Sequence, residues 1–286
     1  MDESTSILDG TPRLIDDALR VKSAGKGPIY YTNKDACVNC SSRPTGFHPR
    51  ALVEQLFARI EQNWSERPKG CPSKSEQNWR WQCCVDMALE NESPEVRLER
   101  DMINAQAAPV GSDGIRDWAN QVPVASGLLG RYADRRMAVD LAHRCPEHAN
   151  CYALIELKLK EESGTPLYAA FEILRYGLLF LFFRCHREEL QHNTATSPLL
   201  TAQRLHLRVL APDSYYVGSA LAWLEEDLNA ALKSFARDKA GLAMDFSFWS
   251  CPSTLTPQEW LKYWERGGRP YAITTKKESS EAEHVA

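Results

Sequence analysis

Charged side chains interrupt two short apolar segments in the middle of the chain. Asp140 interrupts AVDLAHR, and Glu156 and Lys158 interrupt CYALIELKLK. Two carboxylates held close together repel unless one is protonated or a cation lies between them. A hard divalent ion such as Mg²⁺ resolves this repulsion, because it binds carboxylates together with waters and phosphate oxygens. A lysine two residues along the strand can orient or deprotonate a water, or neutralise charge on a phosphate. These residues therefore indicate metal-assisted chemistry on a phosphate.

Both segments alternate as β-strands do, and we expect strands over 135–143 and 152–160. One face of the second strand is apolar and is expected to meet the core, whereas Glu156, Lys158 and Lys160 occupy the other face. If Cys145 and Cys151 close a five-residue loop, Asp140 lies opposite Glu156. The two carboxylates then converge on one point. The alternative is an exposed strand face on which Glu156 and Lys158 form an ordinary ion pair.

Two helices are expected beside these strands. A helix over 94–105 begins with Pro94, and its apolar arc contains Glu95 and Glu99. A buried glutamate is costly unless it is paired or binds a metal, although one of the two can lie at the margin of the arc. A second helix begins at Thr165 and Pro166 and continues to about residue 184. Its first turns carry a polar side that can reach the same site: Tyr168, Glu172, Arg175 and Tyr176. A local ion pair between Glu172 and Arg175 is the simpler alternative.

This succession of elements resembles the PD-(D/E)XK nuclease superfamily, also called restriction-endonuclease-like. The likeness consists of a helix with an inward glutamate, a strand with Asp140, a strand with IELK and a following helix, and it covers about residues 93 to 211. Members use Mg²⁺ to hydrolyse phosphodiester bonds with an activated water. The resemblance implies the same activity here, with Mn²⁺ as a possible substitute and nucleic acid, DNA ahead of RNA, as the partner. A non-catalytic binding or interaction module on the same fold is the alternative.

The resemblance also implies residue roles. Asp140 and Glu156 are the strand acids and metal ligands, and Lys158 is the catalytic lysine. Glu99 is the helix acid, with Glu95 in reserve, and the main-chain carbonyl of Leu157 joins the metal shell. One departure is that Val139, rather than a proline, precedes Asp140. Five further side chains are expected to contact the substrate: Arg136, Lys160, Tyr168, Glu172 and Arg175.

The remaining pattern predicts an α/β fold with a mixed central sheet flanked by helices, organised as a restriction-endonuclease-like core over 93–252. A loop-rich stretch precedes the first strand, from about 106 to 131. Further strands are expected at 204–211 and 242–249, and a further helix at about 219–235. Residues 1–92 form an N-terminal extension in which Pro49 begins a helix. Residues 253–286 form a C-terminal segment with a disordered tail.

Composition limits the classes of partner and location. The net charge of −4 shows that the chain as a whole is not strongly basic. Any surface that binds nucleic acid must therefore be a local patch of basic residues. Nine cysteines, an odd number, indicate a reducing compartment rather than a disulfide framework. The opening residues do not form a signal peptide, and the longest uninterrupted apolar run, YGLLFLFF, is too short to span a membrane. We therefore expect a cytoplasmic protein with no membrane partner.

Cysteine and histidine offer a second kind of site. Cys37 and Cys40 are spaced like half of a zinc site, but the other cysteines stand at no standard spacing from them. A zinc-organised interaction module built on this pair remains an open alternative. Cys145 and Cys151 are expected only to neighbour each other across the hairpin loop.

Overall fold

The computed structural model describes most of the chain. The described residues are 6–20, 42–67, 77–83, 94–105, 117–130, 132–145, 148–159, 164–190, 192–251 and 271–272. Expectations about Cys37, Cys40, Lys160 and the C-terminal tail lie outside these residues.

One mixed β-sheet forms the centre of the described structure. Its six strands lie side by side in chain order. β1, β2 and β3 form an antiparallel meander, β3, β4 and β5 run parallel, and the two-residue β6 pairs antiparallel with β5. The bounds are β1 Trp118–Pro123, β2 Ala138–Arg144, β3 Cys151–Leu157, β4 Arg204–Pro212, β5 Ala243–Cys251 and β6 Tyr271–Ala272. The expected α/β fold with a mixed central sheet is confirmed.

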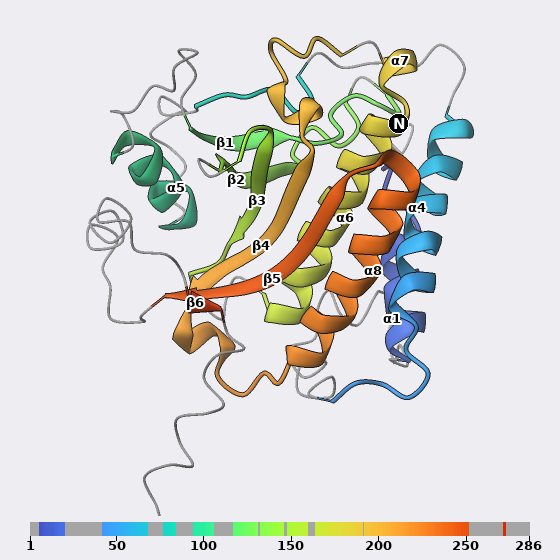
Figure 1. Ribbon diagram of the computed structural model, residues 1–286, viewed down its shortest axis with the longest axis vertical. Helices are drawn as coiled ribbons and strands as arrows, with labels where there is room; N and C mark the ends of the chain where they lie inside the picture. Colours follow the sequence, from blue (N-terminus) through green and yellow to red (C-terminus); the bar gives the residue numbers. More distant parts are fainter. Residues whose placement is uncertain are drawn as a thin grey trace, which may run out of the picture.

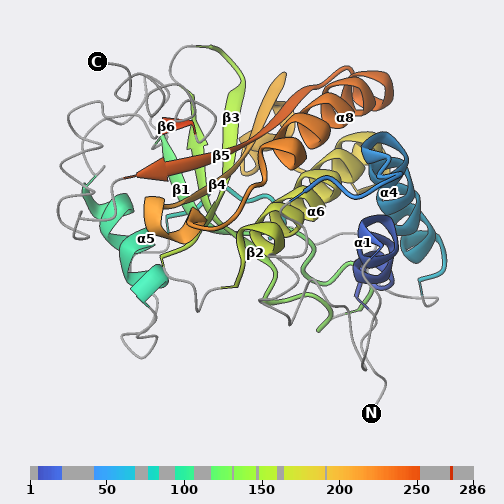
Figure 2. The same ribbon diagram turned by 90° about the horizontal axis from the view of Figure 1, so that it is seen from below.

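Helices cover both faces of this sheet. The α-helices are α1 Thr11–Leu19, α4 Pro49–Ser65, α5 Pro94–Ala105, α6 Pro166–Cys185, α7 Arg187–Leu190 and α8 Ala222–Ala240, and short 3₁₀ turns occupy η2 Pro198–Thr201 and η3 Asp213–Tyr216. α6 connects β3 to β4 and α8 connects β4 to β5, as parallel neighbours require. Figures 1 and 2 show α6 and α8 on one face with α4 and α1 outside them, and α5 on the opposite face.

The central helix α6 begins as the sequence predicts. The Thr165 side chain accepts a hydrogen bond from the Tyr168 amide at 3.2 Å, and Pro166 occupies the first turn. α6 is buried almost all round because the sheet lies on one side and α4 and α8 on the other. It is also long and apolar enough to cross a membrane, but 89% of its apolar window is buried inside the protein.

Apolar side chains pack on both faces of the sheet. The larger cluster fills the space between the sheet and the helices α6, α8, α4 and α1, and it extends from Ile7 to Phe248. The smaller cluster lies under α5, where Leu98 and Met102 pack with β-strand residues that include Ile155. Every residue of β3 is buried. The expectation that Glu156 and Lys158 face away from the core is therefore wrong, and so is the alternative of an exposed strand face, because both side chains are buried.

Several element boundaries differ from those predicted. The stretch expected to be loop-rich contains β1, which pairs with β2 along its length. The helix α1 was not predicted. The described part of residues 1–92 does not stand apart from the rest, since α1 and α4 contribute to the same apolar cluster as α6 and α8. The helix predicted from Pro49 is confirmed, and its Leu52, Leu56 and Ile60 are buried.

Candidate active site

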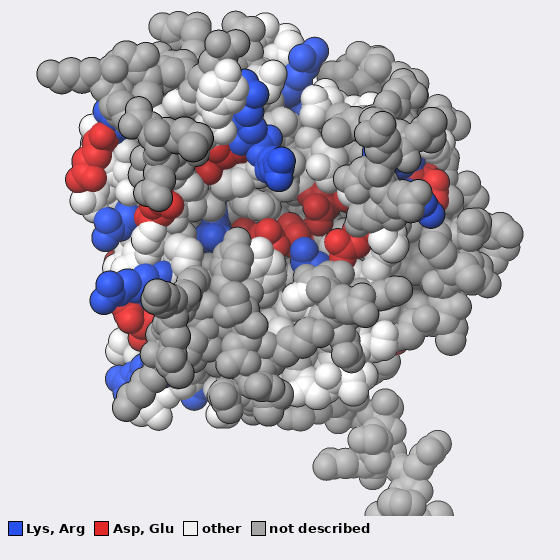
Figure 3. Space-filling view, turned by 180° about the vertical axis from the view of Figure 1, so that it is seen from behind, with Lys and Arg blue, Asp and Glu red and all other residues white. Residues whose placement is uncertain are grey.

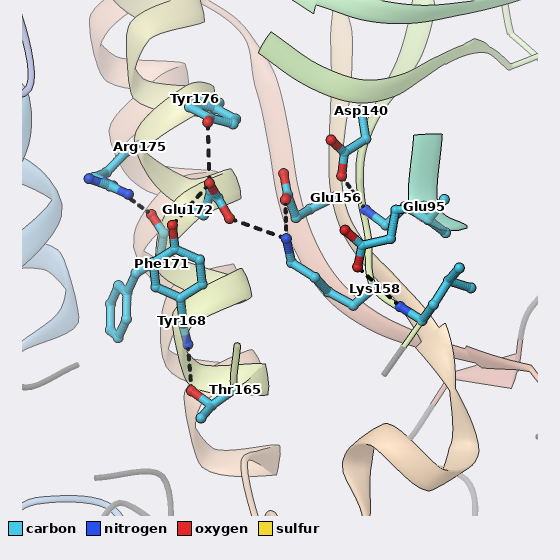
Figure 4. Close-up of polar contacts among 12 residues, drawn as sticks. Glu95, Asp140, Glu156, Lys158, Thr165, Tyr168, Phe171, Glu172, Arg175 and Tyr176 are labelled. Atoms are coloured by element: carbon cyan, nitrogen blue, oxygen red, sulfur yellow. Dashed lines mark hydrogen bonds and ion pairs between the residues drawn. The ribbon is translucent and has the colours of Figure 1, made fainter. Parts of the chain in front are cut away.

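The hairpin of β2 and β3 has the predicted register. Leu141 pairs with Ile155, and the pairing continues to Arg144 and Tyr152. Asp140 and Glu156 stand one position beyond the last pair, so they are opposed at the point where the two strands separate. There the Asp140 carboxylate accepts a hydrogen bond from the main-chain N–H of Leu157, at 2.8 Å (Figure 4). A side chain thus replaces the strand-to-strand hydrogen bond at this position.

Asp140 also interrupts the side-chain alternation of β2. Val139 packs in the larger apolar cluster, whereas Leu141, two residues later, packs in the smaller one. Residues two apart in a regular strand share a face. The alternation of side chains expected of a β-strand therefore breaks between Val139 and Leu141. At this break the Asp140 side chain points toward β3, where it contacts the Leu157 amide.

Lys158 connects β3 to α6 through two carboxylates. Its ammonium lies 2.6 Å from Glu156 Oε1 and 3.4 Å from Glu172 Oε2 (Figure 4). Glu172 in turn accepts hydrogen bonds from the hydroxyls of Tyr168 and Tyr176, at 3.2 and 3.3 Å. The first turns of α6 therefore reach the site as expected, but Glu172 pairs with Lys158 there.

One oxygen of the Glu156 carboxylate receives no hydrogen bond from an N–H or hydroxyl donor of the described residues. Glu156 is only 3% exposed, and this oxygen, Oε2, is buried. A buried carboxylate oxygen without a donor is energetically costly. The carboxyl groups of Glu156 and Asp140 lie within hydrogen-bond reach of each other, so a proton bound by one of them can be shared with the other.

A third acid comes from the opposite layer. Glu99 of α5 is buried, as the inward arc of the helix predicts, and its carboxylate accepts a hydrogen bond from Gln121 Nε2 at 2.7 Å. Gln121 adopts a left-handed backbone conformation with φ of 50°, which is uncommon outside glycine and changes the direction of its side chain. Glu95, one turn earlier, lies with Oε1 3.4 Å from the Leu159 amide. α5 and α6 thus bring acids to the end of β3 from its two faces.

Burial makes these acids reluctant to ionise. It raises the pKa of Asp140 to about 6 and, together with the charge of Asp140, the pKa of Glu99 to about 8. The pKa of Glu156 lies well above its ordinary value for the same two reasons, burial first and Asp140 second. Burial alone would lower the pKa of Lys158, but the carboxylates around it, Glu156 foremost, raise it above its ordinary value. Lys158 is therefore a cation, and the site has more carboxyl groups than one lysine can neutralise.

The other predicted substrate residues lie at different depths. Arg136 is exposed in the turn before β2, whereas Arg175 is only 6% exposed and its Nε donates to the Phe171 carbonyl. Arg175 lines a cavity of about 380 Å³ that also borders Glu172, Tyr176 and residues just before and in the first turn of α1. Figure 3 shows acidic side chains gathered in a hollow across one face of the molecule, with basic side chains beside them.

A second cluster of polar side chains lies at the other end of the hairpin. Ligand atoms of Cys145, Cys151 and His206 lie within 4.8 Å of one another. The sequence did not reveal His206 as a candidate, because it depends on β3 pairing with β4, more than fifty residues later in the chain. The only sequence signal for His206 was its position among the polar residues of a strand in which polar and apolar residues alternate. Gln121 was missed because its strand was expected to be a loop.

No protein-family model, curated protein or solved structure matches this chain. The chemistry of its own residues is therefore the basis for a functional proposal.

Proposed function

We propose that this protein is a Mg²⁺-dependent nuclease, also active with Mn²⁺, that hydrolyses phosphodiester bonds in nucleic acid, DNA in preference to RNA. The observations that support it best are that Asp140 and Glu156 lie at the open end of the β2–β3 hairpin with Lys158, and that the charge of Asp140 acts on the buried Glu99. The order of elements, α5, then β1 to β3, then α6 and β4, is also the order expected of a restriction-endonuclease-like core.

The donor atoms suit a hard divalent cation. Asp140, Glu156 and Glu99 offer carboxylate oxygens, which Mg²⁺ prefers to nitrogen or sulfur, and the Leu157 carbonyl is the proposed fourth protein ligand. The Oε2 atom of Glu156 is a buried acceptor without an N–H or hydroxyl donor among the described residues, and a cation would compensate for this. A bound cation would also lower the raised pKa values of Asp140 and Glu99 by stabilising their ionised forms. When bound, Mg²⁺ would supply an activated water and stabilise charge developing on the phosphate.

The protein side chains then have distinct tasks. Lys158 stays protonated, so it acts as a hydrogen-bond donor that positions the water or neutralises phosphate charge, and not as a base. Glu172 is a positioning residue, because it holds the Lys158 ammonium from α6 while two tyrosines fix its own carboxylate. The Leu157 amide holds the Asp140 carboxylate in place. These contacts keep the reacting groups in one arrangement before substrate arrives.

Substrate contacts must be local, because the chain has a net charge of −4. Arg136, Arg175 and Lys160 are proposed to contact phosphates, and Tyr168 to contact the substrate beside Glu172. The cytoplasmic location and the absence of a membrane partner remain predictions.

A second candidate is a non-catalytic binding module on the same fold. One observation favours it: Lys158 already pairs with Glu156 and Glu172, so the charges partly satisfy one another in the absence of an ion. In that case the cluster is an internal ion-pair network that fixes α6 against β3.

The deciding experiment is incubation of the purified protein with plasmid DNA, single-stranded DNA and RNA, each with Mg²⁺, Mn²⁺ or EDTA. The proposal expects cleavage that needs metal and is lost in a Glu156→Gln variant prepared in parallel. Binding of nucleic acid without cleavage under every condition would favour the second candidate. A Glu226→Gln variant, changed at an exposed position of α8, controls for contaminating nuclease and for handling.

A further inference from the structure

The loop end of the β2–β3 hairpin brings two sulfurs and an imidazole together. Cys145 follows β2 and Cys151 begins β3, and the Cys145 amide donates to the Cys151 carbonyl at 2.9 Å. His206 stands on the neighbouring strand β4, with its Nε2 atom 3.3 Å from the Cys151 sulfur. All three ligand atoms lie within 4.8 Å of one another.

A carboxylate orients the imidazole. His206 and Asp245 are paired residues of β4 and β5, and both oxygens of Asp245 lie 2.9 Å from His206 Nδ1. Arg208 Nη1 lies 2.6 Å from Asp245 Oδ1, which keeps that carboxylate charged and in place. An ionised carboxylate on Nδ1 favours the tautomer that carries its proton there. The lone pair of Nε2 then points to the cysteines, as in histidines that bind metals.

We propose that Cys145, Cys151 and His206 bind a thiophilic divalent cation, Zn²⁺ foremost, with Asp245 as the carboxylate that orients His206. Zinc bonds of about 2.3 Å to sulfur and 2.0–2.1 Å to nitrogen place these two atoms about 3.6 Å apart at a tetrahedral angle. The sulfur–nitrogen separation of 3.3 Å is close to that value, so only a small movement is needed. Three protein ligands leave the fourth position for water or another group.

A catalytic triad is the strongest competing interpretation, because Cys151, His206 and Asp245 are in contact in that order. Cys151 is only 1% exposed, however, so no substrate carbonyl can approach its sulfur in this arrangement. A triad also gives no role to the second sulfur of Cys145. A metal ion uses both sulfurs and needs far less space than a substrate.

This site is independent of the proposed nuclease centre. Cys145 and Cys151 lie where the hairpin closes, whereas Asp140 and Glu156 lie where its strands separate. Sulfur and imidazole ligands favour zinc, and the carboxylates favour magnesium. Zinc would connect β2 and β3 to β4, and through Asp245 to β5, so its expected role is structural.

The test measures zinc in the full-length protein, purified without chelator, and uses a Cys37→Ser/Cys40→Ser background so that this cysteine pair contributes nothing. We expect one zinc per chain in this background, and a thiolate-to-metal charge-transfer band when Co²⁺ replaces zinc. His206→Gln and Cys151→Ser should no longer bind this zinc ion, whereas His186→Gln and Cys185→Ser should still bind one zinc per chain. Asp245→Asn should bind zinc 10- to 100-fold more weakly in a chelator competition.

Several results would overturn the proposal. They are a background protein with no zinc and no uptake of added zinc, unchanged zinc in His206→Gln, or a cobalt spectrum without a thiolate band. Rapid alkylation of Cys151 that zinc does not slow would favour the triad instead. If Cys151→Ser does not fold, Asp245→Asn and the cobalt spectrum of the parent still decide the question, because neither removes a ligand.

Discussion

The carboxylate of Asp140 accepts a hydrogen bond from the main-chain amide of Leu157 across the open end of the β2–β3 hairpin. This contact uses one acceptor of Asp140 and fixes its direction, while the ladder of main-chain hydrogen bonds ends one position earlier. The site therefore forms where the hairpin stops being a regular sheet. Glu99 and Glu156 are buried and Asp140 is partly buried, so variants that test them should keep side-chain size.

Asp140→Asn and Glu156→Gln should each lower metal-dependent cleavage by at least about 100-fold, because each removes a negative charge from the proposed metal shell. Both changes preserve shape, and circular dichroism and thermal unfolding should show an intact fold. Initial rates on plasmid DNA in Mg²⁺ provide the measurement, with Glu226→Gln as control. Parental rates in both variants would exclude a nuclease centre at these residues.

Glu99 should make the metal-free protein less stable as pH rises. Its pKa is about 8 in the folded protein and near 4.5 when unfolded, so between these values the folded state binds more protons than the unfolded state. The free energy of unfolding then falls with pH, by at most about 1.4 kcal/mol per unit from this group. Urea unfolding from pH 5 to 8.5 measures the slope, which should flatten in Glu99→Gln.

The matched control for that series is Arg100→Gln, which changes the adjacent residue and should retain the slope. Mg²⁺ should restore stability mainly above pH 7, because protons compete less with Mg²⁺ for the carboxylates there. Calorimetry should accordingly show weaker Mg²⁺ binding in Glu99→Gln and unchanged binding in Arg100→Gln. Identical pH slopes in parent and Glu99→Gln would mean that Glu99 is not the titrating group.

Lys158→Met should have opposite effects on metal binding and catalysis. The Lys158 ammonium competes with a cation for Glu156, so its removal should strengthen Mg²⁺ binding by several-fold while cleavage is lost. Without metal, the variant should be less stable by about 3 kcal/mol at pH 8, because a buried ion pair loses one partner. The loss should be smaller at low pH, because the raised pKa of Glu156 favours its neutral form there. Lys233→Met, at an exposed position of α8, is the control. Weaker Mg²⁺ binding in Lys158→Met would contradict the prediction that the Lys158 ammonium competes with Mg²⁺ for Glu156.

Gly177 allows α6 to approach the sheet closely. A Cβ atom at this position would overlap the side chain of Leu207 on β4, although the helical backbone itself would accept alanine. Gly177→Ala should therefore destabilise the protein by about 1–3 kcal/mol, measured by denaturant unfolding. In the double variant Gly177→Ala/Leu207→Ala the overlap is gone, so its cost should be smaller than the sum of the two single changes. If the two single destabilisations simply add up in the double variant, the overlap between an alanine at position 177 and Leu207 is not the cause of the lost stability.

The sequence was most informative where local signals agreed. The bounds of α5 were predicted to the residue, and α6 to within one residue, because a proline begins each helix and the apolar spacing persists through it. The β2–β3 register followed from one loop length and two cysteines. The end at which Asp140 meets Glu156 could therefore be located without knowledge of the rest of the sheet.

Features that depend on distant pairing could not be predicted in this way. β3 looked half-exposed because Glu156 and Lys158 lie in its polar series, yet α6 covers that face and α5 the other. β1 was hidden because its irregular residue Gln121 and its terminal Pro123 interrupt the strand pattern. The partnership of His206 with Cys151 depends on parallel strands separated by a whole helix.

The apolar cluster that joins Ile7 to Phe248 has a consequence for synthesis on the ribosome. α1 and α4 leave the ribosome long before α8 and β5, which complete the layers that cover them. Until then the buried face of α4 is exposed to water and to other chains. Contacts between segments so far apart in the chain slow folding, because long loops must close before those contacts can form. The nascent chain should therefore depend on chaperones until β5 has emerged.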